Sequence, residues 1–129
     1  IHAAMARVDI ALPGLDDARK LTGREAPEAI CDFYLDLGAR VVALTMGSEG
    51  VMVATAETRV SIPARKAEAV DATGAGDCFD GAFLTRWLET GDAEASARFA
   101  SAAASLSVEG WGAVAPLPRR AAVEAMLGA

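Results

Sequence analysis

The sequence has one histidine, two cysteines and no long apolar run, and each shortage argues against a class of protein. His2 lies at the very start of the chain, where a loose terminal residue is expected, so a histidine-dependent catalytic triad is disfavoured. Cys31 and Cys78 form no Cys-x-x-Cys pair, which favours a reduced, cytoplasmic protein. No stretch reaches the roughly 18 apolar residues of a membrane-spanning helix, so we expect no membrane partner.

The charge pattern argues against a nucleic-acid partner. The chain carries 12 Lys and Arg against 18 Asp and Glu, a formal net charge of -6. Its largest basic clusters are the pairs Arg65-Lys66 and Arg119-Arg120, which are too small for a nucleic-acid surface. The 129 residues, 53% of them hydrophobic, suffice for one domain with a single core. Because the chain begins at Ile1 without an initiator methionine, we expect a processed or partial chain.

Apolar runs and turn residues predict helices that alternate with strands. The runs at 8–12 and 41–45 lack polar alternation, as in strands buried on both faces, and 51–54 with 59–62 predict a hairpin. The first residues are expected to be the approach to a strand. Helices are predicted over 15–22, 27–37, from the glycine-rich segment to about 90, over 92–108 and over 118–127. This order predicts an α/β fold with a mostly parallel sheet, one hairpin and helices on both faces.

A glycine-rich corner stands where an extended segment meets the long helix. Gly74, Ala75 and Gly76 are small enough for a ligand to approach the main chain, and the first N–H groups of a helix lack intrahelical partners. These features predict an anion site with Asp77 beside it. Glycine corners are common, however, and a first-turn aspartate often only favours the helix dipole. The pattern matches neither a Walker A loop nor a dinucleotide fingerprint, so by itself it leaves both interpretations open.

The residues around this corner resemble a known sequence signature. Asp71-Ala72-Thr73-Gly74-Ala75-Gly76-Asp77, followed by Phe79 and Gly81-Ala82-Phe83, resembles the carboxy-terminal signature of the ribokinase-like (PfkB-type) carbohydrate kinases. Ala72 departs from the usual Thr or Pro. The resemblance implies a three-layer αβα fold and ATP-dependent phosphorylation of a sugar hydroxyl. It also implies that Asp77 is the general base and that the amides of Gly74, Ala75 and Gly76 form an anion hole.

Two other segments occur in the order of that family. Residues 45–50 resemble its ATP-contacting turn, which implies nucleotide contacts for Thr45, Gly47, Ser48 and Gly50. Residues 13–17 stand where many members carry Pro-Asn-x-x-Glu near the phosphates and Mg²⁺. In this chain Gly14 replaces the Asn and Asp17 replaces the Glu, so Asp17 is either a carboxylate on the metal side or only a helix-dipole partner.

The resemblance continues to the end of the chain. Ser101 takes the position near the adenine or ribose, and Asp71 the position of a monovalent-cation ligand, K⁺ in some members. Main chain around Thr73, Ser107, Gly110 and Gly112 would complete that cation site, whereas Pro116 stands where a cation-binding Ser is common. The match covers the whole chain but only the carboxy-terminal half of a family member. The half that carries most sugar-binding residues and the lid is therefore expected to be absent.

The subgroup is suggested by both ends of the match. Residues 12–17 and 110–118 look most like ketodeoxygluconate kinases, with fructokinase and ribokinase types next. The implied partners are ATP, Mg²⁺ and a sugar or sugar acid, and the full-length protein is expected to be a homo-oligomer. The alternative function is a nucleotide-binding or regulatory module without catalytic activity.

Overall fold

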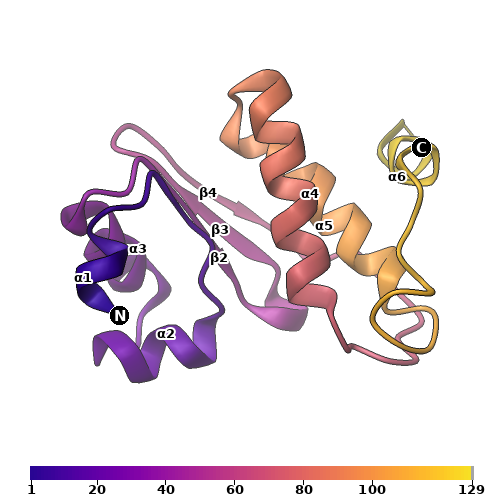
Figure 1. Ribbon diagram of the computed structural model, residues 1–129, viewed down its shortest axis with the longest axis horizontal. Coiled ribbons are helices and arrows are strands. Elements are labelled where there is room, and N and C mark those ends of the chain that lie inside the picture. Colours follow the sequence, from indigo (N-terminus) through magenta and orange to yellow (C-terminus); the bar gives the residue numbers. More distant parts are fainter. Residues whose placement is uncertain (129) are drawn as a thin grey trace. The chain divides into compact units, whose positions relative to one another are not determined.

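The computed structural model describes residues 1–128, which form two compact units, residues 1–63 and residues from 64 onward. Each unit has its own cluster of buried side chains, where the sequence suggested a single core. Figure 1 shows the chain as a ribbon diagram. The first unit contains α1 (His2–Met5), β1 (Ile10–Ala11), α2 (Leu15–Thr22), α3 (Pro27–Leu37), β2 (Val41–Thr45), the 3₁₀ turn η1 (Gly47–Glu49), β3 (Val51–Ala54) and β4 (Arg59–Ile62).

The four strands form one sheet in the order β1-β2-β3-β4. β1 pairs with β2 in parallel, whereas β2 with β3 and β3 with β4 are antiparallel. The predicted hairpin is present, but only one of the three pairings is parallel, because β3 turns back on β2 after η1. Within these residues the sheet is therefore mixed rather than mostly parallel.

The core of the first unit lies between α3 and the sheet. Ile30, Cys31 and Tyr34 recur at helical spacing and are buried, as are Val42 and Leu44 of β2. Burial raises the pKa of the Cys31 thiol to about 11, so this cysteine is a protonated core residue. Pro27 starts α3 and Gly38, with φ of 125°, ends it, as the sequence predicted.

The start of the chain differs from the prediction. Residues 2–5 form the short helix α1 rather than the approach to a strand, and β1 has two residues instead of five. His2 is not loose, since its Nε2 lies 3.0 Å from the Leu21 carbonyl oxygen and its ring packs edge-on against Phe33. A four-residue helix is too short to leave a periodic pattern in the sequence.

The second unit is helical, with α4 (Ala75–Thr90), α5 (Ala93–Ser107) and α6 (Arg120–Gly128). Figure 1 shows α4 and α5 side by side. Phe99, Ala102 and Ala103 of α5 form a core cluster with Val123 of α6. No helix among residues 1–128 is both long and apolar enough to cross a membrane.

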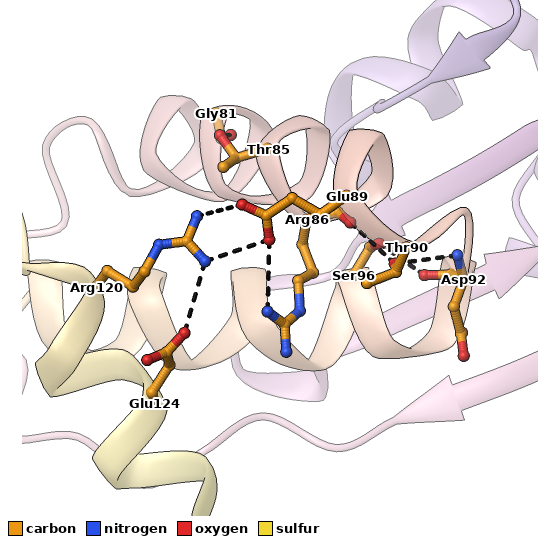
Figure 2. Close-up of polar contacts among 9 residues, drawn as sticks. All are labelled: Gly81, Thr85, Arg86, Glu89, Thr90, Asp92, Ser96, Arg120 and Glu124. Carbon is orange, nitrogen blue, oxygen red and sulfur yellow. Dashed lines mark hydrogen bonds and ion pairs between the residues drawn. The ribbon is translucent and has the colours of Figure 1, made fainter.

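A polar network joins α6 to α4 (Figure 2). Both terminal nitrogens of Arg120 donate to Glu89, at 2.6 Å and 3.2 Å, and Arg86 Nη1 lies 3.5 Å from the same carboxylate. Arg86 and Arg120 also lie over the ring of Phe99, at 5.3 Å and 5.6 Å from its centroid. This network holds the first turn of α6 against the last turn of α4.

Candidate functional site

The first turn of α4 presents main-chain donors. Gly74 is its N-cap in the left-handed conformation, with φ of 76°, and no side chain caps the helix. The Gly74 carbonyl accepts from Cys78 N–H at 2.9 Å, while Ala75 N–H donates to the Ala72 carbonyl at 3.2 Å. Among the described residues, the N–H groups of Gly74, Gly76 and Asp77 have no acceptor. Two of the three predicted amides are therefore open, and that of Ala75 is engaged.

The two glycines of the corner serve different purposes. A Cβ atom on Gly74 would lie 2.9 Å from Ala113 Cβ, and the positive φ also favours glycine there. A Cβ atom on Gly76 would meet nothing within 4 Å. Gly74 is required by its own packing, whereas Gly76 leaves space that a ligand could fill.

Asp77 lies beside these open donors. Its side chain is exposed in the first turn of α4, where a negative charge interacts favourably with the helix dipole. Gly74 and Asp77 are among the residues that line a pocket of about 570 Å³, together with Arg120 and Val123. An exposed carboxylate that lines a pocket can accept a proton from a bound hydroxyl.

Asp80 is the second carboxylate of this turn. Burial, and after it the negative charge of Asp77, raises the pKa of Asp80 to about 6. Asp77 and Asp80 are three residues apart and so lie on neighbouring helix positions. No local pattern in the sequence reveals the burial that raises the pKa of Asp80.

Asp71 connects the corner to the loop after α5. Its Oδ1 accepts from Thr73 Oγ1 at 2.6 Å and from Thr73 N–H at 2.9 Å, and its Oδ2 accepts from Gly112 N–H at 2.9 Å. These bonds, the Thr73 hydroxyl first, lower the pKa of Asp71. Sequence reasoning placed Asp71 near Thr73 and Gly112 for a cation site, but it missed the direct bonds. No group of three His, Cys, Asp or Glu within residues 1–128 is arranged to hold a metal ion.

Ser101 is the residue of the second unit that is predicted to contact the nucleotide. It lies on α5 and is 9% exposed, one of three buried polar residues within residues 1–128. Trp111 is 77% exposed on the loop after α5.

The predicted ATP turn lies in the first unit. Thr45 ends β2, and its Oγ1 donates to the Pro13 carbonyl at 3.4 Å. Gly47 and Gly50 have φ of 57° and 97°, which the tight turn requires. Ser48 is exposed between them. The structure thus brings Thr45 next to the chain that enters α2.

Asp17 lies on the first turn of α2, whose N-cap is Gly14. Gly14 forms a bridge with Thr45, so the start of α2 and the end of β2 are neighbours in the first unit. The Asp17 side chain is 85% exposed and its nearest charged partner is Lys20 at 4.0 Å. This geometry suits a solvated helix-dipole partner and leaves the carboxylate accessible.

Solved structures with the same fold match nearly the whole of this chain. The crystal structure of ribokinase from Thermotoga maritima superposes with a TM-score of 0.89 and 30% identity, covering 100% of this chain and 45% of that one. A putative ribokinase II from E. coli, in complex with ATP and Mg²⁺, has a TM-score of 0.91 at 27% identity, covering 98% and 41%. The fold is therefore ribokinase-like, as the sequence predicted.

Sequence comparison gives the family. The model of the pfkB family carbohydrate kinases matches residues 1–120, and the chain belongs to that family. Ribokinase from Bacillus subtilis is 40% identical over 119 residues, which are 88% of this chain and 41% of the relative. An ATP-dependent 6-phosphofructokinase from Thermoanaerobacterium thermosaccharolyticum is 34% identical over 118 residues, 92% and 37%. The chain spans less than half the length of these relatives.

Proposed function

We propose that the complete protein transfers the γ-phosphoryl group of ATP to a hydroxyl of a sugar or sugar acid, with Asp77 as general base. The observation that carries this proposal is the first turn of α4. Open N–H groups of Gly76 and Asp77 stand in free space beside an exposed carboxylate. Membership of the pfkB family supports the same chemistry. An uncapped helix N-terminus attracts anions, and a carboxylate there is placed to take a proton.

The proposed reaction needs little covalent work from the protein. The acceptor oxygen forms a bond to the γ-phosphorus as its proton passes to Asp77. The bond between that phosphorus and the bridging oxygen breaks, and ADP leaves with the electron pair. The N–H groups of Gly74 and Gly76 stabilise charge on the transferred phosphoryl oxygens, while Ala75 joins them only if its bond to Ala72 opens.

The nucleotide is proposed to contact five residues, which are Thr45, Gly47, Ser48, Gly50 and Ser101. When bound, Mg²⁺ would neutralise charge on the phosphates, with Asp17 as the carboxylate on its side. The accessible Asp17 side chain, on the first turn of the helix whose N-cap Gly14 bridges to Thr45, supports this assignment.

We further propose that this chain is the ATP-binding and catalytic part of a larger kinase domain. Leu84 and Leu88 of α4 are 41% and 85% exposed and lie four residues apart on the helix, so both are available for contact with a further part of the domain. β1 pairs only with β2 among the described strands, which leaves its other edge open. A further part of the domain, with most sugar-binding residues and the lid, would cover such surfaces. We expect the complete enzyme to be a cytoplasmic homo-oligomer without a nucleic-acid partner.

Two observations bear on the acceptor. Residues 12–17 and 110–118 favour ketodeoxygluconate, whereas the relatives described above are ribokinase and 6-phosphofructokinase enzymes. A coupled assay of the complete protein with ketodeoxygluconate, fructose, ribose and fructose 6-phosphate would identify the preferred acceptor. If nucleotide binds but no acceptor is phosphorylated, the alternative of a regulatory module would replace the kinase proposal.

The role of Asp77 is tested by its amide variant. Asp77→Asn keeps the shape but removes the proton acceptor, so kcat of the complete enzyme should fall by roughly 10²–10⁴-fold while ATP affinity changes little. Asp80→Asn is the matched control, because it removes a neighbouring carboxylate of the same helix. If Asp80→Asn causes the large loss and Asp77→Asn does not, the base has been assigned to the wrong residue.

A further inference from the structure

One ion pair fixes the start of α6 against the end of α4. Both terminal nitrogens of Arg120 donate to the Glu89 carboxylate, at 2.6 Å and 3.2 Å (Figure 2). The hydrogen bond from Arg120 is the main reason that the pKa of Glu89 is lowered, so the pair is ionised at neutral pH. The guanidinium group also lies 5.6 Å from the centroid of the Phe99 ring. A bidentate pair of this kind fixes orientation as well as distance.

Arg120 also lines the pocket that Asp77 lines. Four apolar residues of the loop before α6 line it too, and we call them the apolar wall: Ala113, Val114, Leu117 and Pro118. The loop that carries the wall is held to α4 at both ends. At one end, a Cβ atom on Gly74 would come within 2.9 Å of the Ala113 Cβ atom. At the other end, Arg120 follows the wall by two residues and is bound to the last turn of α4.

The lining of this pocket offers water few hydrogen-bond partners. Its helical side is formed largely by small or apolar residues, including Ala82, Phe99, Ala103 and Val123. Two of its polar side chains are already engaged, since the Thr85 hydroxyl donates to the Gly81 carbonyl at 2.8 Å and Arg120 donates to Glu89. An ordered water needs two to four polar partners. The space beside the proposed base Asp77 is therefore poorly suited to hold ordered water.

We propose that Arg120 is a positioning residue that, held by Glu89, keeps the apolar wall in place and so limits the access of water to Asp77. This role rests on the function proposed above. Water at the base could replace the sugar as acceptor. Its oxygen would form a bond to the γ-phosphorus as one proton passed to Asp77, the bond from that phosphorus to the bridging oxygen would break, and ADP would leave with the electron pair. A fixed wall thus favours transfer to the sugar over hydrolysis of ATP.

Hydrolysis of ATP without a sugar measures this role. Glu89→Gln keeps the shape of the side chain but removes the charge that holds Arg120. We expect the complete protein with this change, given ATP and Mg²⁺ alone, to release inorganic phosphate about three- to ten-fold faster, as expected for the loss of one partly exposed bidentate pair. Arg120→Lys keeps the charge but not the paired geometry, so its increase should be smaller. Peptides over residues 113–122 should exchange their amide hydrogens faster in both variants.

Glu94→Gln is the matched control. It breaks the ion pair between Glu94 and Arg98 at 2.6 Å, which lies within α5 of the same unit. Neither of these two residues lines the pocket, as far as residues 1–128 describe it. This variant should leave the release of phosphate and the exchange of residues 113–122 unchanged. All variants are assayed well below the midpoint of their thermal unfolding, so that general loss of structure does not contribute.

A double variant separates this proposal from the function on which it rests. If Asp77 accepts the proton of water, Asp77→Asn combined with Glu89→Gln should lose the additional hydrolysis. Additional hydrolysis that persists in the double variant would contradict Asp77 as the base, and with it the proposed function, while it would support a wall that excludes water. Unchanged hydrolysis in Glu89→Gln, or an equal increase in Glu94→Gln, would overturn the role of Arg120.

Discussion

Two helices of the second unit begin in opposite ways. α5 starts at Asp92, whose Oδ1 accepts from Ala95 N–H at 2.9 Å and whose carbonyl accepts from Ser96. α4 starts at a left-handed glycine with no capping side chain. A capping side chain stabilises a helix, typically by about 1 kcal/mol. α2 and α3 also begin without a capping side chain, so the missing cap by itself does not distinguish α4. What distinguishes α4 is the free space at Gly76 together with the open N–H groups, which the proposed anion site requires.

The largest expected effect concerns whether the open end is sufficient by itself. Residues 1–129 alone should show no sugar kinase activity, because a base without a positioned acceptor loses a contribution worth about 7–11 kcal/mol in well-oriented reactions. A coupled assay of the purified chain, with the complete enzyme as positive control, would measure this. A monomeric chain 1–129 that phosphorylates a sugar would contradict the proposed division of the domain.

The comparison is sharpened by placing the same side chain at both helix starts. Gly76→Val should fill the space at α4 and weaken the preference for ATP over ADP by roughly 10–100-fold, the value of one charge-assisted bond. Ala93→Val adds the same branched side chain to the first residue of α5 and should leave nucleotide binding unchanged. Titration calorimetry with ATP and with ADP on both variants would measure this preference. Equal discrimination in the two would place the phosphates elsewhere.

A smaller effect is expected from the half-buried carboxylate of α4. The pKa of Asp80 is raised to about 6 in the folded protein, so its ionisation opposes folding. Stability should fall as pH rises from about 4 to about 6, and Asp80→Asn should remove that fall. At pH 7.5 the variant should gain on the order of 1–2 kcal/mol, and at pH 3.5 nothing, in urea unfolding. A variant less stable than the wild type at pH 7.5 would show that ionised Asp80 has a favourable partner.

The smallest expected effect returns to the capped helix. Asp92→Ala should lower the free energy of unfolding by about 1 kcal/mol, because Ala95 N–H loses its acceptor. ATP affinity should not change. Asp92→Ser, which can still cap, should recover most of the stability in thermal or urea unfolding. If the alanine variant loses ATP binding at unchanged stability, the two helix starts would not differ as described.

The helices and strands that are bounded by capping or turn residues were predictable from the sequence. Gly38, Gly91 and Asp92 mark helix ends by backbone conformation or by a local side-chain bond, and the structure places helix boundaries beside each. β2, β3 and β4 have the predicted bounds, since runs of apolar residues between turns specify them locally. The corner and Asp77 were found through the family signature. Of the three amides predicted to bind an anion, those of Gly74 and Gly76 are open, whereas that of Ala75 donates to the Ala72 carbonyl.

What could not be predicted depends on residues far apart in the sequence. Gly112 is 41 positions from Asp71, so no local pattern reveals that its N–H donates to that carboxylate. The raised pKa of Asp80 arises from burial by the surrounding fold.

The network around Phe99 restricts which substitutions the chain can accept together. Glu89 contacts both Arg86 and Arg120, and Arg120 also contacts Glu124 (Figure 2). The two guanidinium groups lie over the ring of Phe99. Replacing Glu89 would leave Arg86 without an acidic partner among the described residues and Arg120 with Glu124 alone, whereas replacing either arginine would remove one of the two like charges. The three positions are energetically coupled, so during evolution they should change as a set rather than one at a time.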